Sequence, residues 1–234
     1  MSRKIEMWRD PYGEGFNTCK KREIVIEPGL TVLVGCNGAG KTTMLCNVAE
    51  ELKNENIPVF QFDNTRDGGS YSIDESIATG SYSFGATAMC SSEGENINLN
   101  LGKSAAKWKR FIETGDDGDK TRRFIKAVRK INGEEVEEKE VPNERWILLD
   151  AVDSGFSVDN VVEMKDLFRL VMDDAAAKGI ELYIVVSANE YELAAGEACF
   201  DVIGGKYVRF GGYDEYKKFV LKSRKEKDKR YKER

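Results

Sequence analysis

The chain has 234 residues, of which 41% are hydrophobic, and it carries a formal net charge of −5. This length and apolar content suit one large domain or two small ones with a real core, and the negative total excludes binding of nucleic acid through overall positive charge. The absence of histidine excludes a histidine base, a histidine metal ligand and a histidine pH switch.

Residues 4–34 are predicted to form short strands. Side chains alternate between polar and apolar over residues 22–27, Pro28 and Gly29 form a turn, and the apolar run at residues 30–34 is typical of a buried strand. The N-terminal part is therefore expected to be an antiparallel β region that leads into a buried strand.

A complete G-x-x-x-x-G-K-[ST] motif, here called the P-loop, follows at residues 35–43. A helix is predicted after it, because apolar side chains recur at about 3.6-residue spacing from Leu45 to Leu52. Glycines allow the backbone N–H groups to point at one centre, and the helix N-terminus adds partial positive charge. Lys41 is expected to reach the outer phosphates, and the Thr42 hydroxyl suits Mg²⁺. The P-loop thus predicts a nucleoside triphosphate site formed by Asn37, Gly38, Ala39, Gly40, Lys41, Thr42 and Thr43.

The middle of the chain is less regular. A strand is predicted over residues 57–62, whereas residues 70–92 are rich in small side chains and give no firm prediction. Helices are expected over residues 102–111 and 120–131, with an acidic loop between them, and the charged stretch at 131–141 is compatible with a hairpin.

The last third of the chain returns to clear patterns. Strands are predicted over residues 146–149 and 182–186, with a strong helix between them over 161–177 that Gly179 ends. Its apolar face is formed by Val161, Met164, Phe168 and Val171. A hairpin is expected to turn at Gly204 and Gly205, and a helix from Asp214 loses its apolar face by Leu221.

A second nucleotide-binding feature is the acid at the end of the strand over residues 146–149. Asp150 follows that apolar run about a hundred residues after the P-loop. In P-loop folds an acid there lies beside the loop and holds Mg²⁺, often through water. We therefore predict Asp150 and Thr42 as metal ligands.

These motifs together resemble the ATP-binding cassette superfamily, in its soluble branch with the chromosome-maintenance and RecF-like ATPases. The P-loop is that family's variant, with Asn37, Gly38 and a doubled threonine, and Leu148-Leu149-Asp150 matches its Walker B end. Residues 91–95 resemble the signature motif, in which Ser92, Gly94 and Glu95 match while the leading leucine is Ser91. Residues 154–157 stand at the D-loop, and residues 184–189 stand on the last catalytic strand. The resemblance covers about residues 20–210, and the compact size is similar to members carried by bacteriophages or mobile elements.

The resemblance implies an α/β fold with a mainly parallel central sheet flanked by helices, an N-terminal antiparallel β part and a small helical signature subdomain at about residues 70–142. It also implies ATP and Mg²⁺ as cofactors, and a homodimer that closes on ATP, in which Ser92 and Gly94 of one subunit meet the γ-phosphate bound by the other. The expected organisation is one ATPase domain over residues 1–221 followed by a basic tail over 222–234.

Two departures from the family pattern bear on hydrolysis. Ala151 stands where the family has the acid that polarises the attacking water, and Asn189 replaces the switch histidine. Asp153 offers a carboxylate nearby in a shifted register, and Asn189 can hydrogen-bond a phosphate but cannot titrate. We therefore name Asp150, Asp153 and Asn189 as the catalytic candidates and expect slow turnover.

Other assignments in this family pattern are less specific. Asp63 is a third predicted metal ligand, and together with Gln61 and Asn64 it marks the segment expected to sense the γ-phosphate and Mg²⁺, although Gln61 alone is better explained as a strand residue. Tyr12 or Phe16 is a candidate to stack on adenine, and aromatic residues at such positions are often core.

Positive charge is concentrated in two segments. Residues 102–131 hold ten cations against four acids, and residues 217–234 hold ten against three, which leaves a net of −18 on the rest of the chain. Such segregation is typical of a surface that binds a polyanion, and solvated helix faces are the alternative. Trp108 lies among the lysines, where it can stack on a base or, as we favour, pack in the core.

Three functions fit these observations. The first is a soluble ATPase that dimerises on ATP and acts on DNA, RNA or a protein partner. The second is an ATP-gated switch without hydrolysis, and the third, less favoured, is the nucleotide-binding subunit of a transporter. The five cysteines are scattered, and the charged start lacks an apolar stretch, so we expect no disulfide framework, no signal peptide, no membrane span and a cytoplasmic location.

Overall fold

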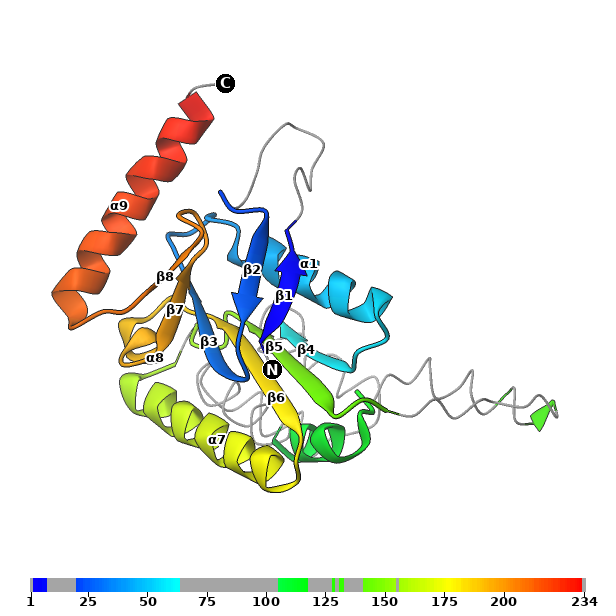
Figure 1. The fold of residues 1–234 in the computed structure, drawn as a ribbon. Coiled ribbons are helices and arrows are strands. Elements are labelled where there is room, and N and C mark those ends of the chain that lie inside the picture. The colour runs from blue at the N-terminus through cyan, green and yellow to red at the C-terminus, as the bar shows by residue number, and fades with distance from the viewer. Residues whose placement is uncertain are drawn as a thin grey trace, which may run out of the picture.

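The computed structural model describes residues 2–7, 20–63, 105–117, 128, 131–132, 141–154 and 156–232, and it consists of helices packed on two β-sheets (Figure 1). The strands are β1 (Arg3–Glu6), β2 (Glu23–Ile26), β3 (Gly29–Val34), β4 (Val59–Asp63), β5 (Glu144–Asp150), β6 (Glu181–Ser187), β7 (Ala198–Asp201) and β8 (Lys206–Val208). The labelled helices are α1 (Lys41–Asn54), α7 (Val158–Ala177), α8 (Tyr191–Ala194) and α9 (Tyr213–Lys232), and residues 105–114 form a further helical segment.

The main sheet has the strand order β4-β5-β6-β3-β7-β8. All neighbours in it are parallel except β7 and β8, which form an antiparallel hairpin. A second sheet pairs β1 with β2 antiparallel. The expected α/β class, with a mainly parallel central sheet and an N-terminal antiparallel part, is confirmed.

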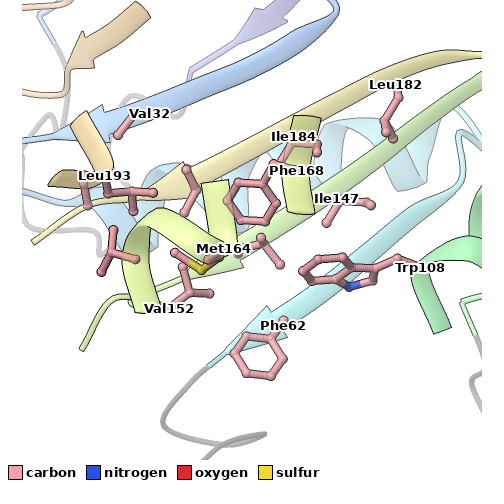
Figure 2. Close-up of a cluster of buried hydrophobic side chains, with 14 of the residues drawn as sticks. Val32, Phe62, Trp108, Ile147, Val152, Met164, Phe168, Leu182, Ile184 and Leu193 are labelled. Atoms are coloured by element: carbon pink, nitrogen blue, oxygen red, sulfur yellow. The ribbon is translucent and has the colours of Figure 1, made fainter. Parts of the chain in front are cut away.

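The sheet is buried on both faces, as continuous apolar strands require. Alternate residues of each strand belong to two separate clusters. Leu33, Leu148 and Val185 pack with the buried side of α1, whereas Val32, Ile147 and Ile184 pack with α7. Figure 2 shows Met164 and Phe168 of α7 in the same cluster as Ile147 and Ile184 of the sheet. The strands are therefore held between two layers of helix, and their carboxyl ends are left for loops.

The helical segment at residues 105–114 belongs to the α7 side of the core. Trp108 is fully buried, and its ring centroid lies 5.9 Å from that of Phe168 (Figure 2). Arg145 at the start of β5 is also buried and donates to the backbone oxygen of Ile112 at 3.2 Å. Trp108 is thus a core residue, as favoured from the sequence, and it does not present its face to a base. The rest of the helical subdomain predicted over residues 70–142 lies largely outside the described residues.

Several predicted ends are confirmed with small shifts. Helix α7 begins at Val158 and closes with Gly179 at φ 70, where the N–H of Gly179 donates to Ala176 and the N–H of Ile180 donates to Ala175. This is the Schellman motif, in which glycine avoids the cost of a left-handed backbone. The β7–β8 turn is fixed by Asp201, whose carboxylate accepts from the backbone of Gly204 at 2.9 Å.

Helix α9 differs most from the expectation. Its apolar face does fade near Leu221, which is 57% exposed, but the helix continues without a break to Lys232. Residues 221 and 222, between which the tail is expected to begin, lie within this one helix, and buried Ser223 forms a polar contact beyond that point that hydrophobic periodicity does not reveal. No helix within the described residues is long and apolar enough to cross a membrane.

Candidate functional site

The P-loop connects the end of β3 to the start of α1, as the sequence predicts. Gly38 and Gly40 have φ values of 72° and 98°, in the left-handed region that glycine enters without strain. A Cβ at Gly35 would lie 2.9 Å from that of Ala39, so this glycine is required for the tight approach of the loop to itself. The loop thus adopts a curled path at the N-terminus of α1, whose first turn holds no acidic side chain to compete with an anion.

Lys41 lies against the P-loop. Its Nζ donates to the backbone oxygen of Gly35 at 3.1 Å, and the residue is only 9% exposed. Burial lowers the pKa of Lys41, while the nearby carboxylates of Asp153 and Asp150 oppose that shift. A buried cation at the N-terminus of a helix is suited to an anionic ligand, because a nearby negative charge favours the charged form of the amine.

Asp150 ends β5, and β6 separates that strand from β3. Ser187 at the end of β6 bridges the gap, since its buried hydroxyl donates to Asp150 Oδ1 at 2.5 Å and accepts from the N–H of Ala151 at 2.7 Å. The sequence resemblance places Ser187 on the last catalytic strand but predicts no contact with Asp150. The available signal was a lone hydroxyl that follows an apolar strand at the carboxyl edge of the sheet.

Mg²⁺ fits the oxygen donors at this edge. Asp150 offers a carboxylate that Ser187 orients, and Thr42 is exposed in the first turn of α1. The backbone of Asp63 pairs in register with Asp150, so the carboxyl ends of β4 and β5 lie side by side here. The side chain of Asp63 is not among those that the structure describes. Among the described residues no three acidic or cysteine side chains form a metal cluster. The donor set therefore matches Mg²⁺ bound by few protein ligands together with water and phosphate.

Asp153 and Asn189 lie side by side and are hydrogen-bonded to each other. Oδ2 of Asp153 accepts from the N–H groups of Asn189 at 2.6 Å and Glu190 at 2.8 Å, and its Oδ1 accepts from Asn189 Nδ2 at 3.2 Å. Asp153 is 1% exposed, and burial raises its pKa despite these hydrogen bonds. This geometry explains the shifted register noticed in the sequence, because Asp153 anchors the loop after β6. Their catalytic assignment stays a prediction.

The chain turns sharply immediately after Asp150. Ala151 has a φ of 51°, which is uncommon for a residue other than glycine. The position where the family pattern expects a water-polarising acid therefore carries a methyl group on a left-handed backbone. The side chain at this position therefore cannot accept a proton from a water molecule.

Of the remaining predicted site residues, one is described by the structure and the others are not. Gln61 is an exposed strand residue that accepts from Lys53 Nζ at 2.7 Å, which agrees with its simple strand role. The signature residues Ser92 and Gly94, and the aromatic candidates Tyr12 and Phe16, lie outside the described residues.

Comparison with known proteins adds little to this geometry. No protein-family model matches the sequence, and no curated protein matches it. Among solved structures, the chain is similar to CbiO1 from Clostridium perfringens, described as part of the ABC transporter complex CbiONQ, with 16% sequence identity and a TM-score of 0.43 over 88% of this chain and 86% of that one. A likeness of this extent carries no assignment of function.

Proposed function

We propose that this chain binds ATP with Mg²⁺ as an ATP-binding cassette type protein and hydrolyses it slowly. The observation that supports this most is the arrangement at one edge of the sheet. The P-loop holds Lys41 against Gly35, and the Asp150 carboxylate, oriented by Ser187, opposes the lowering of the Lys41 pKa by burial.

Each residue has a distinct role in this proposal. The backbone of residues 37–43 binds the phosphates, and Lys41 neutralises their charge. Thr42 and Asp150 hold the metal, which would screen the phosphate charge when bound. Ser187 keeps the Asp150 carboxylate aimed at that position.

Calorimetric titration with Mg²⁺-ATP tests the binding step. Wild type is expected to bind, and Lys41→Ala is expected to lose binding, because the P-loop loses the cation that lies within it. Lys53→Ala is the matched control, since Lys53 pairs with Gln61 on the exposed side of the sheet edge. Equal affinity of wild type and Lys41→Ala would overturn the P-loop assignment.

An ATP-gated switch without hydrolysis is the second candidate. It is favoured by Ala151, which offers no carboxylate. It is also favoured by the hydrogen bonds between Asp153 and Asn189, which occupy the polar groups of both residues. Measured phosphate release with Mg²⁺-ATP separates the two candidates, since release above the rate in buffer identifies an ATPase.

Dimerisation on ATP is part of the same proposal. Light scattering is expected to show a monomer without nucleotide and a dimer with ATP. Ser92→Arg should block the dimer by steric clash and leave ATP binding by the monomer intact. An unchanged mass with and without ATP would contradict a sandwiched dimer.

A polyanionic partner, DNA or RNA, is supported by the exposed cations along α9. They include Lys217, Lys218, Lys222, Arg224 and Lys229. Binding through phosphate contacts is expected to be independent of base sequence and to weaken steeply with salt. If the ATP-bound protein retards no nucleic acid at low ionic strength, a protein partner becomes the better assignment.

A further inference from the structure

Helix α9 makes direct contact with the P-loop. The N–H of Cys36 donates to the hydroxyl of Ser223 at 3.1 Å, and Lys227 Nζ donates to the backbone oxygen of Asn37 at 3.0 Å. These bonds span 187 and 190 residues of sequence, so only the folded arrangement creates them. Figure 1 shows α9 on the side of the sheet that carries the β7–β8 hairpin.

The same helix also reaches the loop that Asp153 anchors. The hydroxyl of Tyr216 donates to the backbone oxygen of Asn189 at 3.1 Å. Tyr216, Ser223 and Lys227 are spaced by seven and four residues, which places them on one face of a helix. Tyr216 and Ser223 are 5% and 4% exposed, so this face is closed to solvent over that length. One rigid helix thus joins two loops at the carboxyl edge of the sheet.

The P-loop needs such support for a physical reason. Its glycines lose more conformational freedom on ordering than other residues, so a preformed loop has an entropic cost. Buried backbone groups also require partners, and Ser223 provides one for Cys36. The approach is close, since a Cβ at Gly38 would lie 3.2 Å from Lys227 Nζ. Gly38 is therefore required by its left-handed backbone, and its missing Cβ leaves room for the end of the Lys227 side chain.

We propose that α9 is a positioning element of the nucleotide site. Ser223 and Lys227 hold residues 36–38 in the conformation that receives phosphate, and Tyr216 ties the same helix to the loop at Asn189. This inference rests on the proposed ATP-binding function. It adds that the P-loop is incomplete without the C-terminal helix, and that nucleotide and α9 stabilise each other's position through thermodynamic linkage.

ATP affinity, measured by calorimetry beside thermal unfolding, tests the positioning role. Ser223→Ala and Lys227→Met are each expected to weaken ATP binding by roughly 3- to 10-fold, the range for one lost hydrogen bond. Lys227→Arg should restore most of the affinity, because a guanidinium can still donate to Asn37. Lys225→Met is the matched control, since it removes the same charge from an exposed position two residues away.

Two results would overturn the inference. One is wild-type affinity in both Ser223→Ala and Lys227→Met. The other is an equal loss in Lys225→Met, which would indicate that α9 contributes only general positive charge. A loss confined to Ser223→Ala and Lys227→Met at an unchanged melting temperature would support positioning rather than a general role in stability.

A second readout needs no nucleotide. The amide of Cys36 is expected to exchange its hydrogen faster in Ser223→Ala than in wild type or Lys225→Met, because its acceptor is removed. If wild type binds no ATP, the proposed function fails, and this exchange rate still decides whether α9 orders the P-loop. Unchanged exchange at Cys36 in Ser223→Ala would overturn the inference directly.

Discussion

Replacing Asp153 should reveal whether this acid stabilises the fold or takes part in hydrolysis. In Asp153→Ala, two backbone N–H groups, of Asn189 and Glu190, and one side-chain amide lose a buried carboxylate partner. A hydrogen bond to a charged group contributes about 1.5–3 kcal/mol, and some of this is recovered because the buried charge is removed. We therefore expect the free energy of unfolding to fall by about 3–5 kcal/mol.

Asp153→Asn is the matched variant. Both backbone N–H groups donate to Oδ2, so a single amide oxygen in that position can accept both bonds. The side chain of Asn189 can turn its own oxygen toward the new amide nitrogen. We expect Asp153→Asn to cost about 1 kcal/mol or less. Asp173→Ala, at an exposed position, is the control. It measures how much the free energy of unfolding changes when an acid is removed from the surface.

Urea unfolding at neutral pH measures these differences in the free energy of unfolding. Repeating it at several pH values tests the direction in which stability changes with pH. The native state binds the Asp153 proton more tightly than the unfolded chain, since burial raises its pKa above the ordinary value of 3.8. The part of the stability that comes from tighter proton binding by native Asp153 is then fully present below that value and is lost as pH rises through the native pKa, whereas the hydrogen bonds to its carboxylate remain. Wild type should therefore lose stability relative to Asp153→Asn as pH increases through this window.

Equal destabilisation by Asp153→Ala and Asp153→Asn would refute this reasoning, as would a loss below about 1 kcal/mol in Asp153→Ala. A stable Asp153→Asn that no longer releases phosphate would identify Asp153 as a catalytic acid. The role assigned to Ala151 would then also be wrong.

Three other predictions concern the site and the core. Ala151→Glu is expected to raise phosphate release, since general-base assistance contributes roughly 10²–10⁴-fold when well aimed; an unchanged rate would indicate that the left-handed backbone directs the new carboxylate away. Asp150→Asn should keep nucleotide binding and weaken its dependence on Mg²⁺ in a metal titration, and an intact dependence would place the metal ligand elsewhere. Trp108→Ala should lower the free energy of unfolding by about 3–5 kcal/mol, because the ring is fully buried, whereas Leu170→Ala at a 68% exposed position should have little effect.

The local elements around the P-loop can be predicted from the sequence. Apolar runs marked β3, β5 and β6, because strands buried on both faces of a parallel sheet need continuous apolar side chains. The glycine pattern of residues 35–43 predicted the curled loop, since the left-handed values at Gly38 and Gly40 are accessible to few other residues. Periodicity and a stop signal at Gly179 located α7 to within three residues.

The contacts between groups that are distant in the sequence depend on the folded arrangement of the strands and helices. Ser187 orients Asp150 because β6 lies between β3 and β5, and strand order is not written in local periodicity. Asp153 turned out to anchor the loop at Asn189, since the direction of a side chain in a turn depends on the backbone of Ala151 before it. The contact between α9 and the P-loop joins residues almost 200 positions apart through single polar atoms. Such bonds leave no hydrophobic pattern in the sequence, and they exist only after the sheet and its helices have brought the two ends of the chain together.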